Sequence, residues 1–365
     1  MKKLTLLFVA LVAASATYAK EVMPVAENVE VAPKLKVESM GTFINYYNLD
    51  VDVSAKSATI MLARQVNSYS NELSIDDDLN RIEYGITTNL SYGDDWTFDI
   101  LASDNYIKGV GGIVNDMSRG YTDLGDRFSS YSSKLKVGAW RHYDNFSIGA
   151  QWAHGNNLDD FELFSTLIGD AWKQDIFSLR GKYHYPVMDG TLLGWADLKY
   201  GFVNDTMIDL AADDNFKYYE IEGMPVAYKY GPVTFGYYIK HREFDDFYDA
   251  EFTEQQLRLS ADLYSNEKLS IYGEYRYGLK MDIDGQIEGH SLSEAFDTKV
   301  LSSGDRQQFI LGAKYSLTEN LMLDANISYQ ILEYNVGGEA IDDMNIDVDN
   351  KFKETQLGLG LTYQF

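Results

Sequence analysis

The feature that most constrains this chain is a strict alternation of apolar and polar residues, which is clearest over its last residues, Leu357–Phe365. Apolar side chains occupy every second position there, and small or polar residues (Gly358, Gly360, Thr362 and Gln364) stand between them. A period of two places successive side chains on opposite faces of a β-strand. The segment therefore predicts a strand with one apolar and one polar face.

The same alternation recurs in pairs of segments that are joined by short, turn-forming sequences. In one pair, Gly93-Asp94-Asp95 separates the segment 79–92 from the segment that begins at Trp96. Such short connections between alternating segments indicate β-hairpins. The chain contains six such hairpins in all, with turns at 93–95, 142–145, 188–190, 230–232, 265–268 and 318–320. Long polar connections separate the hairpins, at 49–78, 107–130, 156–175, 203–215, 244–252, 282–304 and 334–351.

Six short and seven long connections require fourteen strands. Strands of this length, tilted by about 40°, span the roughly 25 Å apolar band of an outer membrane. We therefore predict an all-β fold over residues 35–365, a transmembrane antiparallel up-and-down β-barrel with short periplasmic turns and long extracellular loops. A closed barrel leaves no free edge, so the last strand should pair with a first strand near residues 35–48.

Three segments in the long connections are open to more than one interpretation. Residues 57–70 fit either a loop helix or a further strand, and pairing of that strand would raise the count to sixteen. The segments 158–172 and 291–301 also have helical patterns. We expect such helices to pack on the barrel rim or to fold into the lumen as a constriction.

A soluble β-sandwich is the main structural alternative to a barrel. Turn signals in a sandwich come more evenly, about every 8–12 residues. The aromatic content (28 Tyr, 18 Phe and 5 Trp) also favours the aromatic girdles with which barrels meet the membrane interfaces. Both features favour the transmembrane barrel.

The amino-terminal residues predict export. Met1-Lys2-Lys3 is basic, residues 4–14 are apolar, and Thr17-Tyr18-Ala19 supplies small residues at a cleavage site. This pattern predicts that residues 1–19 form a signal peptide. Residues 20–34 should form a short periplasmic lead-in. The chain has no cysteine and a formal net charge of −25, which disfavours nucleic acid as a partner.

The polar faces of the predicted strands carry most of the basic residues of the wall, interleaved with acids. Two interpretations stay open and can hold together: a lattice of lumenal salt bridges, or a wet pore whose fixed charges bias passing ions. Fourteen strands exceed the roughly eight at which side chains fill a barrel, so a cavity is expected. The pore-lining candidates are Lys134, Lys136, Arg180, Lys182, Lys199, Lys240, Arg242, Arg258, Arg276, Lys280, Lys314, Glu83, Asp99, Asp197, Glu274 and Asp324.

Catalytic and cofactor chemistry find little support. The histidines His142, His154, His184, His241 and His290 show no spacing typical of a metal site or a nucleophile dyad. We therefore expect no enzymatic activity, no cofactor and no metal centre. Surplus acids lie in the long connections and predict a solvated outer surface, with divalent cations bridging it to lipopolysaccharide as a second interpretation.

Both ends of the chain carry a family resemblance. The Met1-Lys2-Lys3 signal, the start Lys20-Glu21-Val22-Met23-Pro24 and the ending Gly360-x-x-Tyr363-x-Phe365 resemble the fusobacterial major outer-membrane porin (FomA-type) family. The resemblance implies a water-filled diffusion pore for small hydrophilic solutes, often a homotrimer, embedded in outer-membrane lipid and able to take part in adhesion. Gly360, Tyr363 and Phe365 also resemble the signal that the barrel-assembly machinery reads, although Gly358 stands at its usual polar position.

The sequence thus predicts a general porin and leaves two rivals. A surface adhesin or structural barrel would keep a closed lumen behind its acidic loops. A substrate-specific transporter for hydrophobic compounds would need an amino-terminal hatch of several tens of residues, and the stretch 20–34 is shorter than that.

Overall fold

The structure is a computed structural model. It describes residues 34–62, 65–69, 73–108, 113–116, 120–123, 129–156, 173–204, 216–245, 251–284, 304–340 and 344–365. The predicted signal peptide, the lead-in before Lys34 and the predicted helical segments 158–172 and 291–301 lie outside these residues. Among the described residues, no helix is long and apolar enough to cross a membrane.

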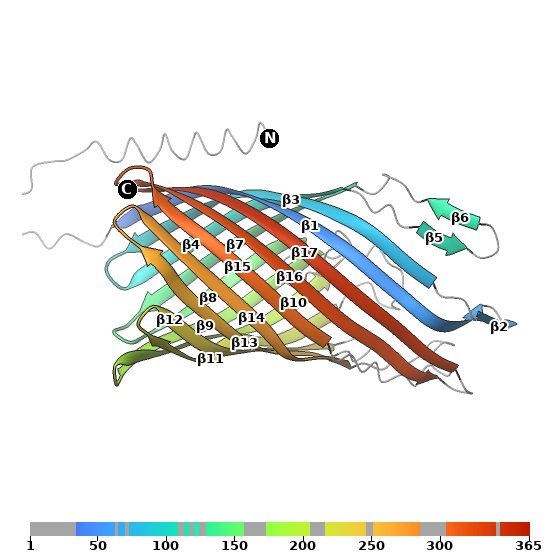
Figure 1. Cartoon of the computed structure of the whole chain (residues 1–365). Coiled ribbons are helices and arrows are strands. Elements are labelled where there is room, and N and C mark those ends of the chain that lie inside the picture. Colours follow the sequence, from blue (N-terminus) through green and yellow to red (C-terminus); the bar gives the residue numbers. More distant parts are fainter. Residues whose placement is uncertain are drawn as a thin grey trace, which may run out of the picture.

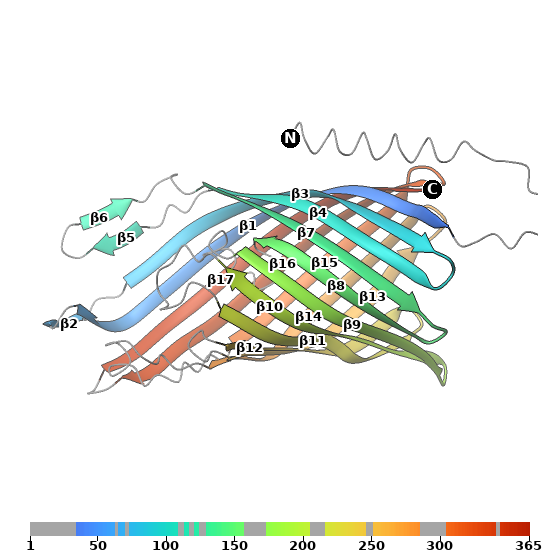
Figure 2. The same ribbon diagram turned by 180° about the vertical axis from the view of Figure 1, so that it is seen from behind.

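The described residues form an all-β fold (Figures 1 and 2). Its strands are β1 (Leu35–Leu62), β2 (Gln65–Tyr69), β3 (Leu73–Tyr92), β4 (Trp96–Lys108), β5 (Ile113–Asp116), β6 (Gly120–Asp123), β7 (Ser129–His142), β8 (Phe146–Asn156), β9 (Lys173–Val187), β10 (Gly190–Asn204), β11 (Phe216–Tyr230), β12 (Val233–Asp245), β13 (Glu251–Ser265), β14 (Leu269–Asp284), β15 (Gly304–Ser316), β16 (Leu321–Ala340) and β17 (Met344–Gln364).

The main sheet closes on itself as a barrel. Its antiparallel order runs from β17 through β16 down to β7, then to β4, β3 and β1, and β17 pairs back onto β1. The closing register joins Ser39 to Gln364 and Asn48 to Thr355, which confirms the predicted pairing of the last strand with the first. Figure 1 shows the blue β1 lying beside the red β17. Because β2 only pairs with the distal end of β1, the wall has fourteen strands, as predicted.

All six predicted hairpin turns are present. They lie between β3 and β4, β7 and β8, β9 and β10, β11 and β12, β13 and β14, and β15 and β16. Gly93 and Gly231 adopt positive φ angles of 63° and 55° there, a conformation that glycine reaches without the steric cost of a Cβ. The turns and the carboxyl terminus lie at the same end of the barrel (Figure 1). At the opposite end, β1, β3, β16 and β17 extend farther than the other strands of the wall (Figure 1).

The strand extensions correct two predicted loops. Residues 49–62 continue β1, and residues 73–78 begin β3, with Ala55 paired to Leu73. Residues 334–340 and 344–351 likewise belong to β16 and β17, with Ala340 paired to Met344. The predictions of loops over 49–78 and 334–351 were wrong because the many acidic residues there suggested loops, although the alternation continues at Leu49, Val51 and Val53 and at Met344, Ile346 and Val348.

The segment 57–70 is neither a loop helix nor an additional strand of the wall. Residues 57–62 complete β1 and residues 65–69 form β2, and these pair as a small hairpin from Ala58↔Tyr69 to Leu62↔Gln65. The predicted loop 107–130 contains another small hairpin, β5–β6. Neither hairpin adds a strand to the closed wall, so the alternative of sixteen is excluded.

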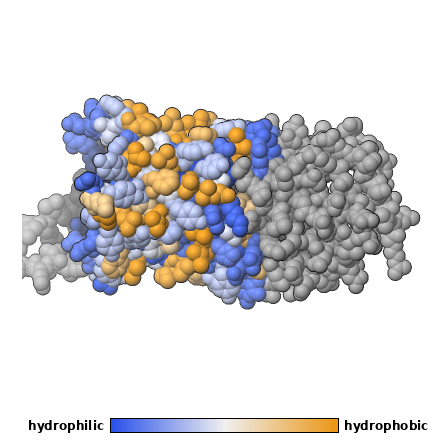
Figure 3. Space-filling view, turned by 60° about the horizontal axis from the view of Figure 1, so that its bottom comes forward, coloured by the Kyte–Doolittle hydropathy of each residue, from blue (hydrophilic) through white to orange (hydrophobic). Residues whose placement is uncertain are grey.

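The outer surface of the wall carries an apolar belt. Outward side chains such as Leu179, Leu198, Ile221, Leu311 and Leu359 are exposed in every part of the sheet. Figure 3 shows hydrophobic residues gathered in a band between more hydrophilic rims on the face in view. A contiguous apolar surface of this extent is unfavourable in water and matches the hydrocarbon core of a bilayer. The barrel is therefore a membrane-spanning one.

Aromatic side chains mark the turn end of this belt. Trp96 stacks with Phe98 at a centroid distance of 6.5 Å, and Tyr143 stacks with Phe146 at 4.4 Å. At the carboxyl terminus the rings of Tyr363 and Phe365 meet edge to face at 4.9 Å. Such rings are favoured at the level of the lipid headgroups, because they are apolar in body and polar at the edge.

Candidate functional site: the lumenal wall

The inward face of the wall is polar and largely paired. Alternation along β12 and β13 places Tyr238, Lys240 and Arg242 and then Glu254 and Gln256 on this face. All of these side chains are buried, although the outward residues between them are more exposed. A dense polar network thus covers one side of the lumen.

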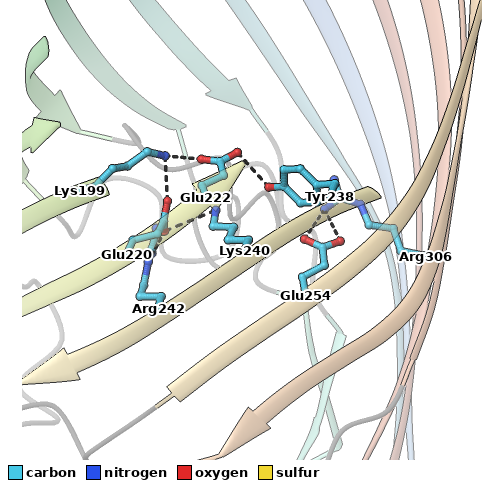
Figure 4. A network of polar contacts seen from close by, with 8 residues as sticks. All are labelled: Lys199, Glu220, Glu222, Tyr238, Lys240, Arg242, Glu254 and Arg306. Atoms are coloured by element: carbon cyan, nitrogen blue, oxygen red, sulfur yellow. Dashed lines mark hydrogen bonds and ion pairs between the residues drawn. The ribbon is translucent and has the colours of Figure 1, made fainter. Parts of the chain in front are cut away.

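Glu220 on β11 is the centre of this network (Figure 4). Its carboxylate accepts hydrogen bonds from Lys199 Nζ at 2.8 Å and Arg242 Nε at 2.7 Å, and Lys240 Nζ lies at 3.7 Å. The side chain of Glu220 is fully buried. Three cations around one carboxylate compensate its loss of hydration, and each of them in turn is stabilised by it.

The network continues across neighbouring strands. Lys199 also bonds Glu222, and Tyr238 Oη donates to Glu222 at 2.9 Å (Figure 4). Farther round the wall, Arg306 Nη1 donates to Glu254 at 3.1 Å. Arg258 lies over the Tyr238 ring, 3.6 Å from its centroid. These contacts join β10, β11, β12 and β13, and they reach β15 across β14, so the charges of five strands are held in a fixed arrangement.

Other predicted lining residues form shorter pairings. Lys134 pairs with Glu83, and the pair Lys314 and Asp324 lies at 3.8 Å. Arg276 contacts Glu274 and donates to Gln308 at 3.0 Å. The predicted lattice of salt bridges between neighbouring strands is present in part, since the Lys314–Asp324 pair joins neighbours, whereas Lys134–Glu83 spans β4 and Arg276–Glu274 lies within β14. Lys136 lies on the inward face opposite Leu101 and Ala153, and it has partners as well.

Lys280 departs from the predicted lining. A β-bulge in β14 places Gly278 opposite Gln256 and Lys280 opposite Gln255. Directly paired residues share a face, and Gln255 faces outward between the buried Glu254 and Gln256. Lys280 therefore lies on the outer face and Met281 takes the inward position, where it is buried. A bulge of one residue reverses a period of two, and the residue pattern alone does not show it.

A cavity of about 930 Å³ opens along β7 to β10 toward the turn end. Its charged lining consists of Asp99, Arg180, Lys182 and Asp197, and Trp140 and Trp195 add two indole rings. Arg180 Nε donates to Asp197 at 3.2 Å. The Arg180 guanidinium and the Lys182 ammonium each lie 4.7 Å from the Trp140 ring centroid. This side of the lumen is thus open, in contrast to the buried network around Glu220.

Local sequence explains how Trp140 reaches those cations. Gly149 on β8 lies between Trp140 on β7 and Arg180 on β9 in the sheet register. A Cβ at Gly149 would lie 2.8 Å from the indole and 2.6 Å from the Ala139 carbonyl oxygen. Because glycine has no side chain, the indole can lie across β8 and contact the neighbouring strand.

The sequence prediction omitted the aromatic and amide residues of the lumen. Trp140, Trp195, Tyr218 and Tyr238 face inward with the charged residues, and so does Gln256. The alternation contained this information, because each of these residues lies on the same face of its strand as a charged lumenal residue (Lys136, Lys199, Glu220, Arg242 and Arg258, respectively). The prediction considered only charged residues and therefore left these residues out.

Inward residues become apolar toward the ends of the strands that lie opposite the turns. Ala153, Ile176, Val203 and Tyr218 form a buried cluster there, and Phe244 packs against it. The cluster adjoins the charged network, since Arg242 lies 4.3 Å from the Tyr218 ring centroid. The lumenal wall therefore changes from charged to apolar along the barrel axis.

A closed fourteen-strand wall with an apolar outer belt, an ion-paired lumen and an open polar cavity defines the class as an integral outer-membrane β-barrel. No protein-family model matches the chain, and no curated protein matches it. Among solved structures, it is similar to a deltaS2 mutant of the monoaromatic hydrocarbon channel TodX from P. putida, with 10% identity over 90% of this chain and 91% of the other and a TM-score of 0.48.

Two further similar structures come from other pseudomonads. A Pseudomonas aeruginosa FadL homologue has 9% identity over 90% of each chain and a TM-score of 0.34. A BenF-like porin from Pseudomonas fluorescens Pf-5 has 12% identity over 90% of this chain and 99% of the other, with a TM-score of 0.36. At these low values, nothing about the solute of this chain follows from the likeness.

Proposed function

We propose that this protein is a general porin, which lets ions and small hydrophilic solutes diffuse passively across the outer membrane of a Gram-negative-type bacterium. The observation that carries the proposal is the cavity of about 930 Å³ inside a closed barrel, lined by charged and aromatic side chains. Polar walls lower the barrier for a hydrated solute, because they replace part of its hydration shell.

The charge arrangement supports a diffusion pore with limited selectivity. Most lumenal cations contact a carboxylate, as in the group around Glu220. Paired charges leave a weak net field at a distance, so ions of both signs can approach the wall. The resemblance of the chain ends to fusobacterial porins supports the same proposal, and with it a homotrimer in contact with outer-membrane lipid and lipopolysaccharide.

A liposome swelling assay tests this function. Vesicles that contain the refolded barrel should swell in isotonic solutions of small sugars, at rates that fall as the sugar becomes larger. A barrel denatured before reconstitution is the control for leakage. Swelling no faster than that control would overturn the proposal.

A closed surface barrel is the second candidate, and the buried network favours it. The side chains of Tyr218, Glu220 and Gln256 are almost fully buried although they face the lumen. Such packing would suit an adhesin whose wall serves only as an anchor. That function predicts binding of intact cells to the folded protein without any swelling of the vesicles.

A further inference from the structure

Lys182 on β9 occupies an unusual position in the lumen. Its cross-strand neighbours are Ser147 on β8 and Trp195 on β10, whereas the next inward residue, Arg180, has Asp197 as its neighbour and ion-pair partner. Within the described part of the chain, no ion pair joins Lys182 to a carboxylate. The exposed ammonium group faces the cavity.

We propose that this part of the cavity is a binding site for small organic anions that have a flat apolar body, such as aromatic carboxylates. The proposal deepens the porin function and rests on it for the access of solutes. It states that the lumen retains one chemical class of solute instead of passing all small solutes alike.

The charge around Lys182 selects an anion. Trp140 holds the ammonium from one side at 4.7 Å, which fixes its position without neutralising it. The imidazole of His184 also lines the cavity and can donate a hydrogen bond, whereas the Ser147 hydroxyl is already bonded to His142 Nδ1 at 2.9 Å. A carboxylate placed there would receive a charge-assisted hydrogen bond from Lys182.

The rings around Lys182 select the body of the ligand. Trp195 is its direct cross-strand neighbour, and Leu193 extends the apolar lining toward the turn end. The Trp195 ring lies 6.3 Å from that of Tyr238, so it is supported from the side of the buried network. A flat apolar group can stack on such an indole while its carboxylate reaches the ammonium.

The carboxylates of the cavity do not cancel this preference. Asp197 is buried and bound to Arg180. Asp99 on β4 extends over Gly138 on β7 and accepts a weak hydrogen bond from Gln151 on β8 at 3.5 Å. Neither acid forms an ion pair with Lys182, so the ammonium keeps its charge for a ligand.

Tryptophan fluorescence can test the site with para-nitrobenzoate, whose nitro group quenches indole emission. The barrel is kept folded in detergent micelles, and the neutral para-nitrobenzyl alcohol serves as the matched probe of the same shape. Para-nitrobenzoate should quench saturably, and Lys182→Gln should weaken its binding about fivefold, as expected for one charge-assisted contact. Lys314→Gln, on β15 across the barrel, should leave the affinity unchanged.

Three results would overturn the proposal: equal affinity for the anion and the alcohol, equal weakening by Lys182→Gln and Lys314→Gln, or no saturable quenching. If Lys182→Gln does not fold, salt provides the test on the unaltered protein. Raising the ionic strength should weaken binding of the anion and spare the alcohol, because salt screens only the charged contact. The fluorescence assay measures binding at equilibrium and involves no transport. Absence of binding to this site can therefore be distinguished from absence of conduction through the barrel.

Discussion

The indole of Trp140 lies directly over Gly149, at a distance of 2.8 Å from the position that a Cβ would occupy there. This contact lets one aromatic ring cross β8 and cover Arg180 and Lys182 on β9. The shape and the charge of the open cavity thus depend on the absence of a side chain at one glycine.

Gly149→Ala should therefore destabilise the barrel and move the indole. The new methyl group would also meet the Ala139 carbonyl oxygen at 2.6 Å, and the backbone cannot yield as a flexible side chain can. We expect the free energy of unfolding, measured with urea, to fall by about 1–3 kcal/mol and the tryptophan emission to shift. Gly181→Ala is the matched control, because nothing lies within 4 Å of its Cβ position. Equal stability of the two variants would contradict this account.

Glu220→Gln should be among the most destabilising single changes in the lumen. It would leave the cations Lys199, Lys240 and Arg242 without their shared carboxylate in a buried place. Loss of one partner of a buried ion pair costs about 3–5 kcal/mol. In the control Glu333→Gln, the lost pair with Lys351 is half exposed, and the free energy of unfolding should change by less than about 1 kcal/mol. Urea unfolding of both variants in vesicles would reveal whether burial makes this difference.

Neutralising Lys182 should make the pore more selective for cations. The side chain is exposed to the cavity, so its field acts on passing ions within about 8 Å at physiological salt. The reversal potential in a salt gradient should shift for Lys182→Gln. Lys351→Gln removes the same charge from the outer face of β17 and should leave the potential in place. A shift of the same size in both variants would mean that net charge, and not the position of Lys182, sets selectivity.

Deletion of Phe365 should reduce assembly into the outer membrane more than it changes the assembled pore. Its backbone N–H donates to the Glu38 carbonyl at 3.1 Å, and its ring packs on Tyr363 at the seam of the barrel. Phe235→Ala removes another exposed phenylalanine near the turn end and serves as the control. Quantifying folded barrel in isolated outer membranes tests this, and similar amounts for the two variants would count against an assembly signal.

Alternation of residues allowed the strand number, the six turns and the closure of β17 on β1 to be predicted, because a wall with one apolar face must repeat every second residue. The same reasoning placed Arg180, Asp197 and Arg242 in the lumen. It was wrong at Lys280, where a bulge inverts the phase, and over 49–78, where β1 and β3 extend into the predicted loop. The open cavity could not be predicted, since it depends on contacts among strands that the pattern does not specify, such as Trp140 across Gly149.

Single-channel recording tests the central claim most directly. The refolded barrel, shown to be folded by its heat-modifiable migration, is inserted into a planar lipid bilayer between salt solutions. A water-filled pore predicts stepwise increases in current, with a conductance that rises in proportion to salt concentration. A folded and inserted barrel that gives no current steps would contradict the porin function and favour a closed surface barrel.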